Sequence, residues 1–487
     1  MRRRAVLIHA GSLASTQALQ FGVSLVLVRL LTPHELGLFA IASALVGTAH
    51  GARDLGVSAY LQREPSLDAA RLRAALGLSC AAGAMLAVAL TLLAPVVAAA
   101  FGEPELAALL RTLSLGLVLV PIGAVMTALA LRSGDAAQLA RTTAWGNGSQ
   151  AAVSIALAVA GAGAAAPAWG QVVNMGACSL AVWALRPRAL WGWPRLRGWT
   201  PILRVGRSTL PGTTLAAIQG AAPSLLLGQW GGAAQVGLLG RAQSLAALLP
   251  GMAGMALQFG MLGRWARRHH RGRALGPAVA AATRRLTGLT WPLLAVAAAL
   301  AEPLVVTLFG PAWRDAAPAV APLALLTALA AVFNGAGPAL TAIGRQAWAT
   351  LPQTVTLAAW LGLAAGFALP SGAAGAHRFA QWLLIGGAAA LPCQLWLYGR
   401  WLGVSPALLL HALAPNAAVA LTAGAAAWLG AVAAPAGVPA PAVVAAGLAA
   451  ALPAWWLAVR CRAIAARGTS TAPRPRPQAR LRRTIRK

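Results

Sequence analysis

Long stretches of this chain contain no charged residue, and their apolar positions do not alternate with polar ones. The charge-free runs cover 74–102, 142–185, 316–344, 346–377 and 401–459. A helix of about 20 apolar residues crosses a bilayer, so each run holds one or two spans. Membrane β-strands would instead alternate in segments of roughly ten residues. The pattern predicts an all-α, polytopic membrane protein.

Polar breaks divide the chain into about fourteen predicted transmembrane helices. Their expected ranges are 8–31, 36–60, 74–101, 106–131, 142–162, 167–185, 205–229, 236–262, 286–309, 317–343, 347–369, 378–398, 406–431 and 437–459. We expect two six-helix lobes followed by two further helices. The corresponding units are 1–185 for the first lobe, 186–204 for an interfacial linker, 205–400 for the second lobe, 401–459 for the last two helices and 460–487 for a basic, disordered tail.

Charge placement sets the expected orientation. The chain has 39 Lys and Arg against 9 Asp and Glu, a formal net charge of +30. In a soluble protein this balance would suggest nucleic acid as a partner. Here most basic residues lie in alternate connectors, as the positive-inside rule requires. We therefore expect membrane lipids rather than nucleic acid as partners, and both termini on the cytoplasmic side.

Two short-range patterns bear on processing and chemistry. The basic start Met1-Arg2-Arg3-Arg4 precedes an apolar segment that runs to Leu31, so it is interpreted as the flank of a retained helix rather than of a signal peptide. The sequence has no nucleotide-binding loop, zinc-protease motif or nucleophile elbow, and its four cysteines are far apart. We expect no catalytic residue, no metal and no cofactor.

Three landmarks of the first half recur in the second half in the same order. Gly37-Leu38-Phe39 is echoed by Gly237-Leu238-Leu239, and Pro95 with Phe101-Gly102 by Pro303 with Phe309-Gly310. Gly134 is echoed in the same way by Gly344. Their offsets are nearly equal, which indicates an internal duplication of the kind found in transporter folds. Coincidence among so many glycines and alanines is the alternative.

Arginines within the apolar segments are the candidate functional residues. Flanking connectors do not account for Arg29, Arg53, Arg111 and Arg241, although Arg29 and Arg111 lie near helix ends and can extend to the interface. A charge inside a membrane is costly, so it is by default a candidate functional site. Arg53 follows His50 and precedes Asp54.

Two interpretations of Arg53 stay open. Neighbouring residues on a helix do not face each other, so an ion pair of Arg53 with Asp54 is disfavoured and a partner elsewhere is expected. Arg53 either lines a cavity or belongs to a structural ion pair. A basic cavity selects an anionic cargo, and guanidinium groups bind phosphate oxygens in a forked geometry. Amides within spans, Gln258 and Asn334 among them, either bind sugar hydroxyls or bridge helices.

Specific motifs resemble a known family. The segments RLLTPHELGLF, with Pro33, Glu35 and Gly37, then DLG and LQR, GLLGRAQSL after Gly237, and LFGPAWRDAAP, with Phe309 and Gly310, are similar to polysaccharide transporters of the multidrug/oligosaccharidyl-lipid/polysaccharide (MOP) exporter superfamily. The resemblance is to Wzx-type O-antigen and exopolysaccharide flippases.

The resemblance implies a function. A member of this family would be expected to act as a flippase of the bacterial inner membrane, moving a polyprenyl-diphosphate-linked oligosaccharide to the periplasmic leaflet by alternating access. Substrate-binding candidates are Arg53, Arg241, Arg29, Asp54, Gln258 and Asn334. A polysaccharide polymerase and the export machinery are candidate partners.

Two other functions stay open. A multidrug antiporter of the same superfamily would need a membrane-buried carboxylate, for which Asp54 is the available residue. A membrane glycosyltransferase or polymerase would be expected to show a sizeable acidic external loop, which this sequence lacks.

Overall fold

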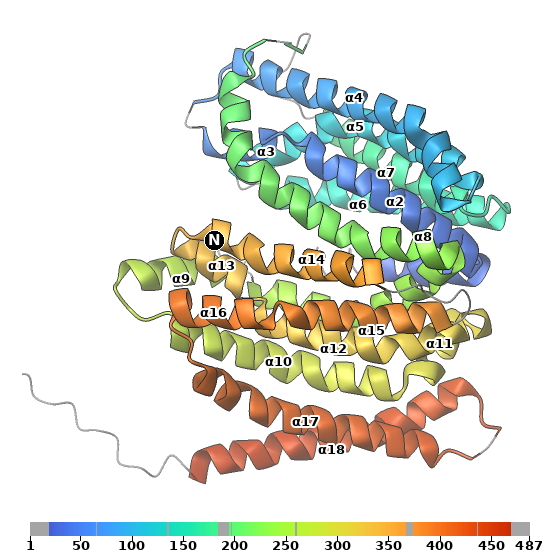
Figure 1. Ribbon diagram of the computed structural model, residues 1–487, viewed down its shortest axis with the longest axis vertical. Helices are drawn as coiled ribbons and strands as arrows, with labels where there is room; N and C mark the ends of the chain where they lie inside the picture. Colours follow the sequence, from blue (N-terminus) through green and yellow to red (C-terminus); the bar gives the residue numbers. More distant parts are fainter. Residues whose placement is uncertain are drawn as a thin grey trace, which may run out of the picture.

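The computed structural model describes residues 19–64, 66–133, 136–183, 194–195, 197–258, 261–366, 374–435 and 437–468. Every regular element within these ranges is helical (Figure 1). By length and composition, 7 of the described helices can cross a membrane, or up to 8 if one bent pair counts as a single span. The predicted class, an all-α polytopic membrane protein, is confirmed.

The helices form two bundles stacked along the long axis of the molecule, with a helical hairpin at the far edge of the second (Figure 1). The first bundle contains α2 (Pro33–Arg53), α3 (Val57–Arg63), α4 (Ala69–Phe101), α5 (Glu105–Ser133), α6 (Ala136–Val159) and α7 (Ala165–Trp183). The second contains α9 (Met261–His270), α10 (Gly276–Ala299), α11 (Ala301–Phe309), η2 (Pro311–Ala316), α12 (Ala317–Phe333), α13 (Ala336–Ala342), η3 (Gln346–Ala349), α14 (Thr350–Gly366), α15 (Ala374–Ala389) and α16 (Leu391–Leu402). The hairpin is α17 (Pro406–Val432) and α18 (Ala440–Gly468), and a short helix, Leu19–Leu30, precedes α2.

One long helix, α8 (Thr200–Gln258), connects the bundles. It is bent at Gly232, whose φ of 78° and ψ of 171° are not helical. The half before the bend follows α2, with Gly206 against the backbone at Leu55 and Gly56. The half after the bend reaches the second bundle, where the Gln235 side chain accepts a hydrogen bond from the Ala376 amide at 2.9 Å.

The TPHE connector begins α2 with a capping box. Thr32 Oγ1 accepts from the Glu35 amide at 3.3 Å, and Glu35 Oε2 accepts from the Thr32 amide at 2.7 Å. Pro33 occupies the first turn, where its missing N–H costs no hydrogen bond. The predicted motif residues Pro33 and Glu35 therefore fix where this helix starts.

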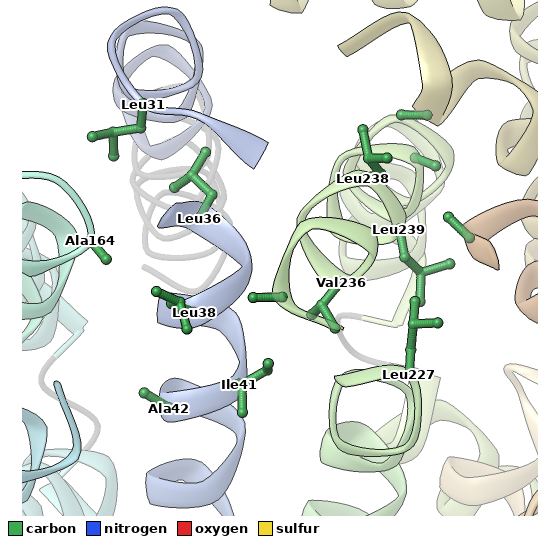
Figure 2. Close-up of a cluster of buried hydrophobic side chains, with 14 of the residues drawn as sticks. Leu31, Leu36, Leu38, Ile41, Ala42, Ala164, Leu227, Val236, Leu238 and Leu239 are labelled. Carbon is green, nitrogen blue, oxygen red and sulfur yellow. The ribbon is translucent and has the colours of Figure 1, made fainter. Parts of the chain in front are cut away.

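The two glycines of the predicted repeat lie against each other. A Cβ on Gly37 would collide with the carbonyl of Ala233, and a Cβ on Gly237 with the carbonyl of Pro33. Because neither residue has a side chain, α2 and the second half of α8 approach at backbone distance. Figure 2 shows these two elements side by side, with buried Leu38, Ile41 and Val236 around the contact.

The apolar core differs at the two ends of the molecule. At the end that contains Pro33, Gly102 and Phe309, called the closed end, one buried cluster runs through both bundles, from Leu38 to Phe379. At the opposite end, called the divided end, each bundle has its own buried cluster, one around Tyr60 and one around Tyr398. Within the described residues, the bundles are thus joined by apolar packing at the closed end.

Several predicted helices are interrupted. The predicted span 36–60 breaks at Leu55 and Gly56, which have positive φ values of 45° and 82°. The predicted span 286–309 bends by 84° between α10 and α11. The span 317–343 is divided into α12 and α13. The apolar content of the sequence predicted where these helical segments lie. It did not predict where they are interrupted, because an interruption depends on local backbone angles and on contacts with a neighbouring helix.

Two landmarks of the predicted repeat lie at helix ends. Both α4, at Phe101, and α11, at Phe309, stop before a glycine with positive φ, 67° at Gly102 and 99° at Gly310. Gly344 likewise has a φ of 73°. Its predicted counterpart, Gly134, lies outside the described residues.

Candidate functional site

A cavity of about 650 Å³ opens within the first bundle toward the divided end. Its wall comes from the end of α2, the start of α3, the second half of α5, and parts of α6, α7 and α8. Among its lining residues are His50, Arg53, Asp54, Ser58, Gln62, Thr127, Thr142, Thr143, Asn174, Cys178, Ser179 and Thr213. We call it the Arg53 cavity.

Arg53 is almost completely buried on this wall, with 2% of its surface exposed. Its Nη1 donates to the Ser79 hydroxyl at 2.9 Å, while its Nε is buried without a partner. No carboxylate of the described residues forms an ion pair with it within 4.0 Å. Of the two interpretations, the structure therefore places Arg53 on a cavity rather than in an ion pair.

The Asp54 carboxylate accepts hydrogen bonds from a residue one turn further along the chain. Its Oδ1 accepts from the Ser58 hydroxyl at 2.6 Å and from the Ser58 amide at 3.3 Å. Asp54 thus accepts from an amide in the first turn of α3, whose own N-cap residue, Gly56, has no side chain to do so. His50, one turn before Asp54, has a buried Nδ1 without a partner in the described residues.

The break after α2 depends on a close contact with α8. Gly56 has a φ of 82°, and a Cβ there would collide with the backbone of Gly206. The two chains are held at backbone distance, which ends α2 directly after Arg53. The same pair of glycines thus positions Arg53 and Asp54 on the cavity wall.

A second cavity, of about 260 Å³, contains Arg241. It lies between the helix Leu19–Leu30, α2, α6, α7 and the second half of α8, and is called the Arg241 cavity. Arg241 donates from Nη1 to the Ser24 hydroxyl at 2.6 Å, and its Nε is buried without a partner. The two predicted arginines therefore lie in different cavities.

Amide side chains connect the two cavities. Asn174, on the Arg53 cavity, donates from Nδ2 to Asn147 Oδ1 at 3.0 Å and to Gln150 Oε1 at 3.1 Å. Asn147 and Gln150 line the Arg241 cavity, where Gln20 also donates to Asn147 at 3.4 Å. Asn147 and Asn174 were not among the residues predicted from the sequence. The feature that could have indicated them is that both are amides inside the charge-free run 142–185.

The other predicted residues lie apart from these cavities. Arg29 is exposed at the closed end, where its Nη2 donates to the Thr307 carbonyl at 3.0 Å and links the helix Leu19–Leu30 to α11. Asn334 follows α12 in the second bundle. Gln258 is the last residue of α8, and its side chain lies outside the described part. Within the described residues, no group of three or more His, Cys, Asp or Glu could hold a metal ion.

Known structures share this fold. The chain is similar to the lipid II flippase MurJ in an inward closed conformation, with a TM-score of 0.78 at 12% identity over 95% of this chain and 100% of that one. It is also similar to an inward-facing MATE multidrug resistance transporter, with a TM-score of 0.62 at 18% identity over 79% of this chain and 94% of that one. A third match is a MOP superfamily transporter from Pyrococcus furiosus, with a TM-score of 0.56 at 17% identity over 81% and 95%.

The fold is therefore that of the MOP transporter superfamily. The family model for polysaccharide biosynthesis proteins matches residues 26–318. This chain belongs to that family, which confirms the resemblance found in its motifs. The search of curated proteins finds no matching sequence.

The amide chain predicts a measurable stability contribution. Asn174→Leu removes the two hydrogen bonds that Asn174 donates, so Gln150 Oε1 loses this donor and Asn147 Oδ1 keeps the longer bond from Gln20. We expect the free energy of unfolding to fall by about 1–2 kcal/mol, since interhelical hydrogen bonds in membranes contribute about 0.6–2 kcal/mol each. Unfolding of the purified protein in mixed micelles by increasing denaturing detergent measures this.

The matched control is Ser149→Ala. Its hydroxyl donates only to the Trp145 carbonyl of the same helix, at 2.8 Å. We expect this variant to unfold like the wild type. Equal stability of Asn174→Leu and Ser149→Ala would contradict a structural role for the amide chain.

Proposed function

We propose that the protein is a flippase for a polyprenyl-diphosphate-linked oligosaccharide. The observation that carries the proposal is the buried Arg53 guanidinium on the wall of a 650 Å³ cavity, with a free Nε and no carboxylate partner among the described residues. A buried cation that forms no ion pair among the described residues favours an anion, and a planar guanidinium suits phosphate oxygens. Membership of the polysaccharide biosynthesis family supports a saccharide cargo.

The proposed path uses the two cavities in turn. The diphosphate enters from the divided end and meets Arg53, while the amides of Asn174, Asn147 and Gln150 offer hydrogen bonds to sugar hydroxyls. Arg241 lies nine residues past the bend of α8, and Arg53 lies twenty residues past Pro33. At about 1.5 Å per residue, roughly 15–20 Å of depth separates them. The diphosphate is passed to Arg241 as the closed end opens, with Arg29 near the exit.

A multidrug antiporter is the second candidate, favoured by the fold shared with the MATE transporter. Such a function would require Asp54 to bind a cation, whereas its Oδ1 accepts hydrogen bonds from Ser58. Loss of surface polysaccharide, with the lipid-linked unit accumulating on the cytoplasmic leaflet, is expected on deletion of the flippase. Drug sensitivity alone would identify the antiporter.

The proposed topology has fourteen spans in the bacterial inner membrane, with both termini and the divided end in the cytoplasm. An impermeant thiol reagent added to intact spheroplasts should therefore modify cysteines introduced as Glu105→Cys or Ala312→Cys at the closed end. Both positions are exposed. Cysteines introduced as Arg63→Cys or Arg271→Cys should react only after the membrane is permeabilised. The reverse labelling would overturn the orientation.

Arg53 gives the central prediction on transport. Arg53→Ala should reduce flipping by roughly tenfold or more, because charge-assisted hydrogen bonds contribute about 1.5–3 kcal/mol each. Arg53→Lys should restore only part of the rate, since lysine keeps the charge and loses the fork. Translocation of a fluorescent polyprenyl-diphosphate saccharide in proteoliposomes, at equal protein density, measures both.

The matched control is Arg111→Ala. Arg111 belongs to α5 of the same bundle, but it is exposed and lines neither cavity. It should flip at close to the wild-type rate. Wild-type flipping by a double variant, Arg53→Ala with Arg241→Ala, would return both arginines to a structural role.

A further inference from the structure

A third cavity lies far from the proposed cargo path, at the divided end of the second bundle. It measures about 390 Å³ and is formed by α9, the turn after it, and the start of α10. Six arginines line it: Arg264, Arg267, Arg268, Arg271, Arg273 and Arg285. It shares no lining residue with the Arg53 or Arg241 cavity. We call it the α9–α10 pocket.

The turn between the helices gathers these charges on one cavity. Gly272 has a φ of 65°, which lets the chain reverse directly after α9. The reversal is fixed by backbone hydrogen bonds from Gly272 to His269 at 2.9 Å and from Arg273 to Arg268 at 3.1 Å. It brings the arginines of α9 opposite Arg285 of α10. Basic residues that only set the orientation of a membrane protein need to lie near the membrane surface, but not near one another. The six arginines, in contrast, line a single pocket.

Within the described part of the chain, none of these six arginines forms an ion pair with a carboxylate. Only two acidic residues, Glu302 and Asp315, follow Asp135 in the sequence. Glu302 pairs with Arg314 at 3.1 Å beyond α10, next to the closed end. Among the described residues, the one side-chain hydrogen bond recorded for the six arginines runs from Arg268 Nε to the Ala274 carbonyl, at 2.8 Å. Like charges gathered this closely repel one another, so binding of an anion from outside the chain would relieve the repulsion.

Phosphate is the anion that fits this set. Guanidinium groups bind phosphate oxygens through paired hydrogen bonds, and several can surround one phosphate group. The volume of 390 Å³ falls within the range of small-molecule sites, about 300–1,000 Å³. Soluble phosphates and phospholipid headgroups both carry the phosphate oxygens that guanidinium groups bind. The other residues around the pocket are therefore used to choose between these two ligands.

The rest of the wall is apolar. It consists of the buried Trp265 on α9 and of the alanines Ala278, Ala281 and Ala282, which precede Arg285 on α10. On α10, Leu289 follows Arg285 by one turn on the same face and is 45% exposed. A headgroup bound at the arginines would therefore have an apolar helix face directly beneath it for its acyl chain.

We propose that the α9–α10 pocket binds the phosphate headgroup of an anionic phospholipid of the surrounding membrane. The arginines hold the phosphate, and the α10 face at Leu289 holds the first part of an acyl chain. The site is independent of the proposed function, because it uses none of the residues assigned to the cargo.

The test measures lipid binding to the full-length protein by native mass spectrometry, in neutral detergent. Phosphatidylglycerol and phosphatidylcholine are titrated separately. The pocket variant combines Arg267→Gln, Arg271→Gln and Arg285→Gln. The control variant combines Arg63→Gln, Arg204→Gln and Arg207→Gln, which removes the same charge from exposed positions at the same end and outside every cavity described above.

We expect the wild type to bind phosphatidylglycerol about tenfold more tightly than phosphatidylcholine, and the pocket variant to lose this preference, since each basic residue near an anionic headgroup adds roughly 1 kcal/mol of attraction. The control variant should keep it. Equal losses in both variants would overturn the proposal in favour of a diffuse charge effect.

Two further measurements can contradict the proposal. If inorganic diphosphate raises the melting temperature of the wild type as much as phosphatidylglycerol does, and not that of the pocket variant, the ligand is a soluble phosphate and the lipid assignment is wrong. If the pocket variant melts below the control variant in neutral detergent, the single variant Arg285→Gln replaces it. That variant should weaken phosphatidylglycerol binding about threefold, and unchanged binding would contradict the proposal.

Discussion

The close approach of α2 and the second half of α8 holds the closed end together. It depends on two glycines, Gly37 and Gly237, because any Cβ at either position would meet a backbone carbonyl of the opposite helix. The buried cluster that runs through both bundles is assembled around this contact. At the divided end no such shared cluster is found among the described residues, and each bundle keeps its own core. The two ends therefore differ in how easily they can separate.

The position of the glycines explains why one contact has this influence. They are counterparts in the predicted repeat. Gly37 lies a few residues after the capping box of α2, and Gly237 a few residues after the bend of α8. Packed cores shift between discrete arrangements rather than deforming continuously. A contact between equivalent points of two similar bundles is a natural place for such a change. Arg53 and its cavity lie toward the other end, where cargo would enter.

The sequence predicted the fold class, the family and the importance of the TPHE connector, because long apolar runs, a capping box and spaced glycines are local signals. It also selected Arg53 as a candidate, since a charge within an apolar run is conspicuous, and the structure places this residue on the wall of a cavity. The break at Leu55 and Gly56 was missed because it depends on contact with Gly206, which is distant in the chain. The chain of amides through Asn147 and Asn174 was missed for the same reason: two helices must pack before these side chains meet.

The most direct test of this account is the separation of the two bundles at the closed end. Spin labels on cysteines introduced as Glu105→Cys and Ala312→Cys, in a background with the native cysteines replaced by serine, report this distance by pulsed electron resonance. We expect Gly37→Leu to shift the distribution toward longer distances, because a side chain at this position cannot fit against the Ala233 carbonyl. Gly47→Leu should leave it unchanged, because a Cβ at Gly47 meets nothing within 4 Å. Identical distributions for Gly37→Leu and Gly47→Leu would contradict the account.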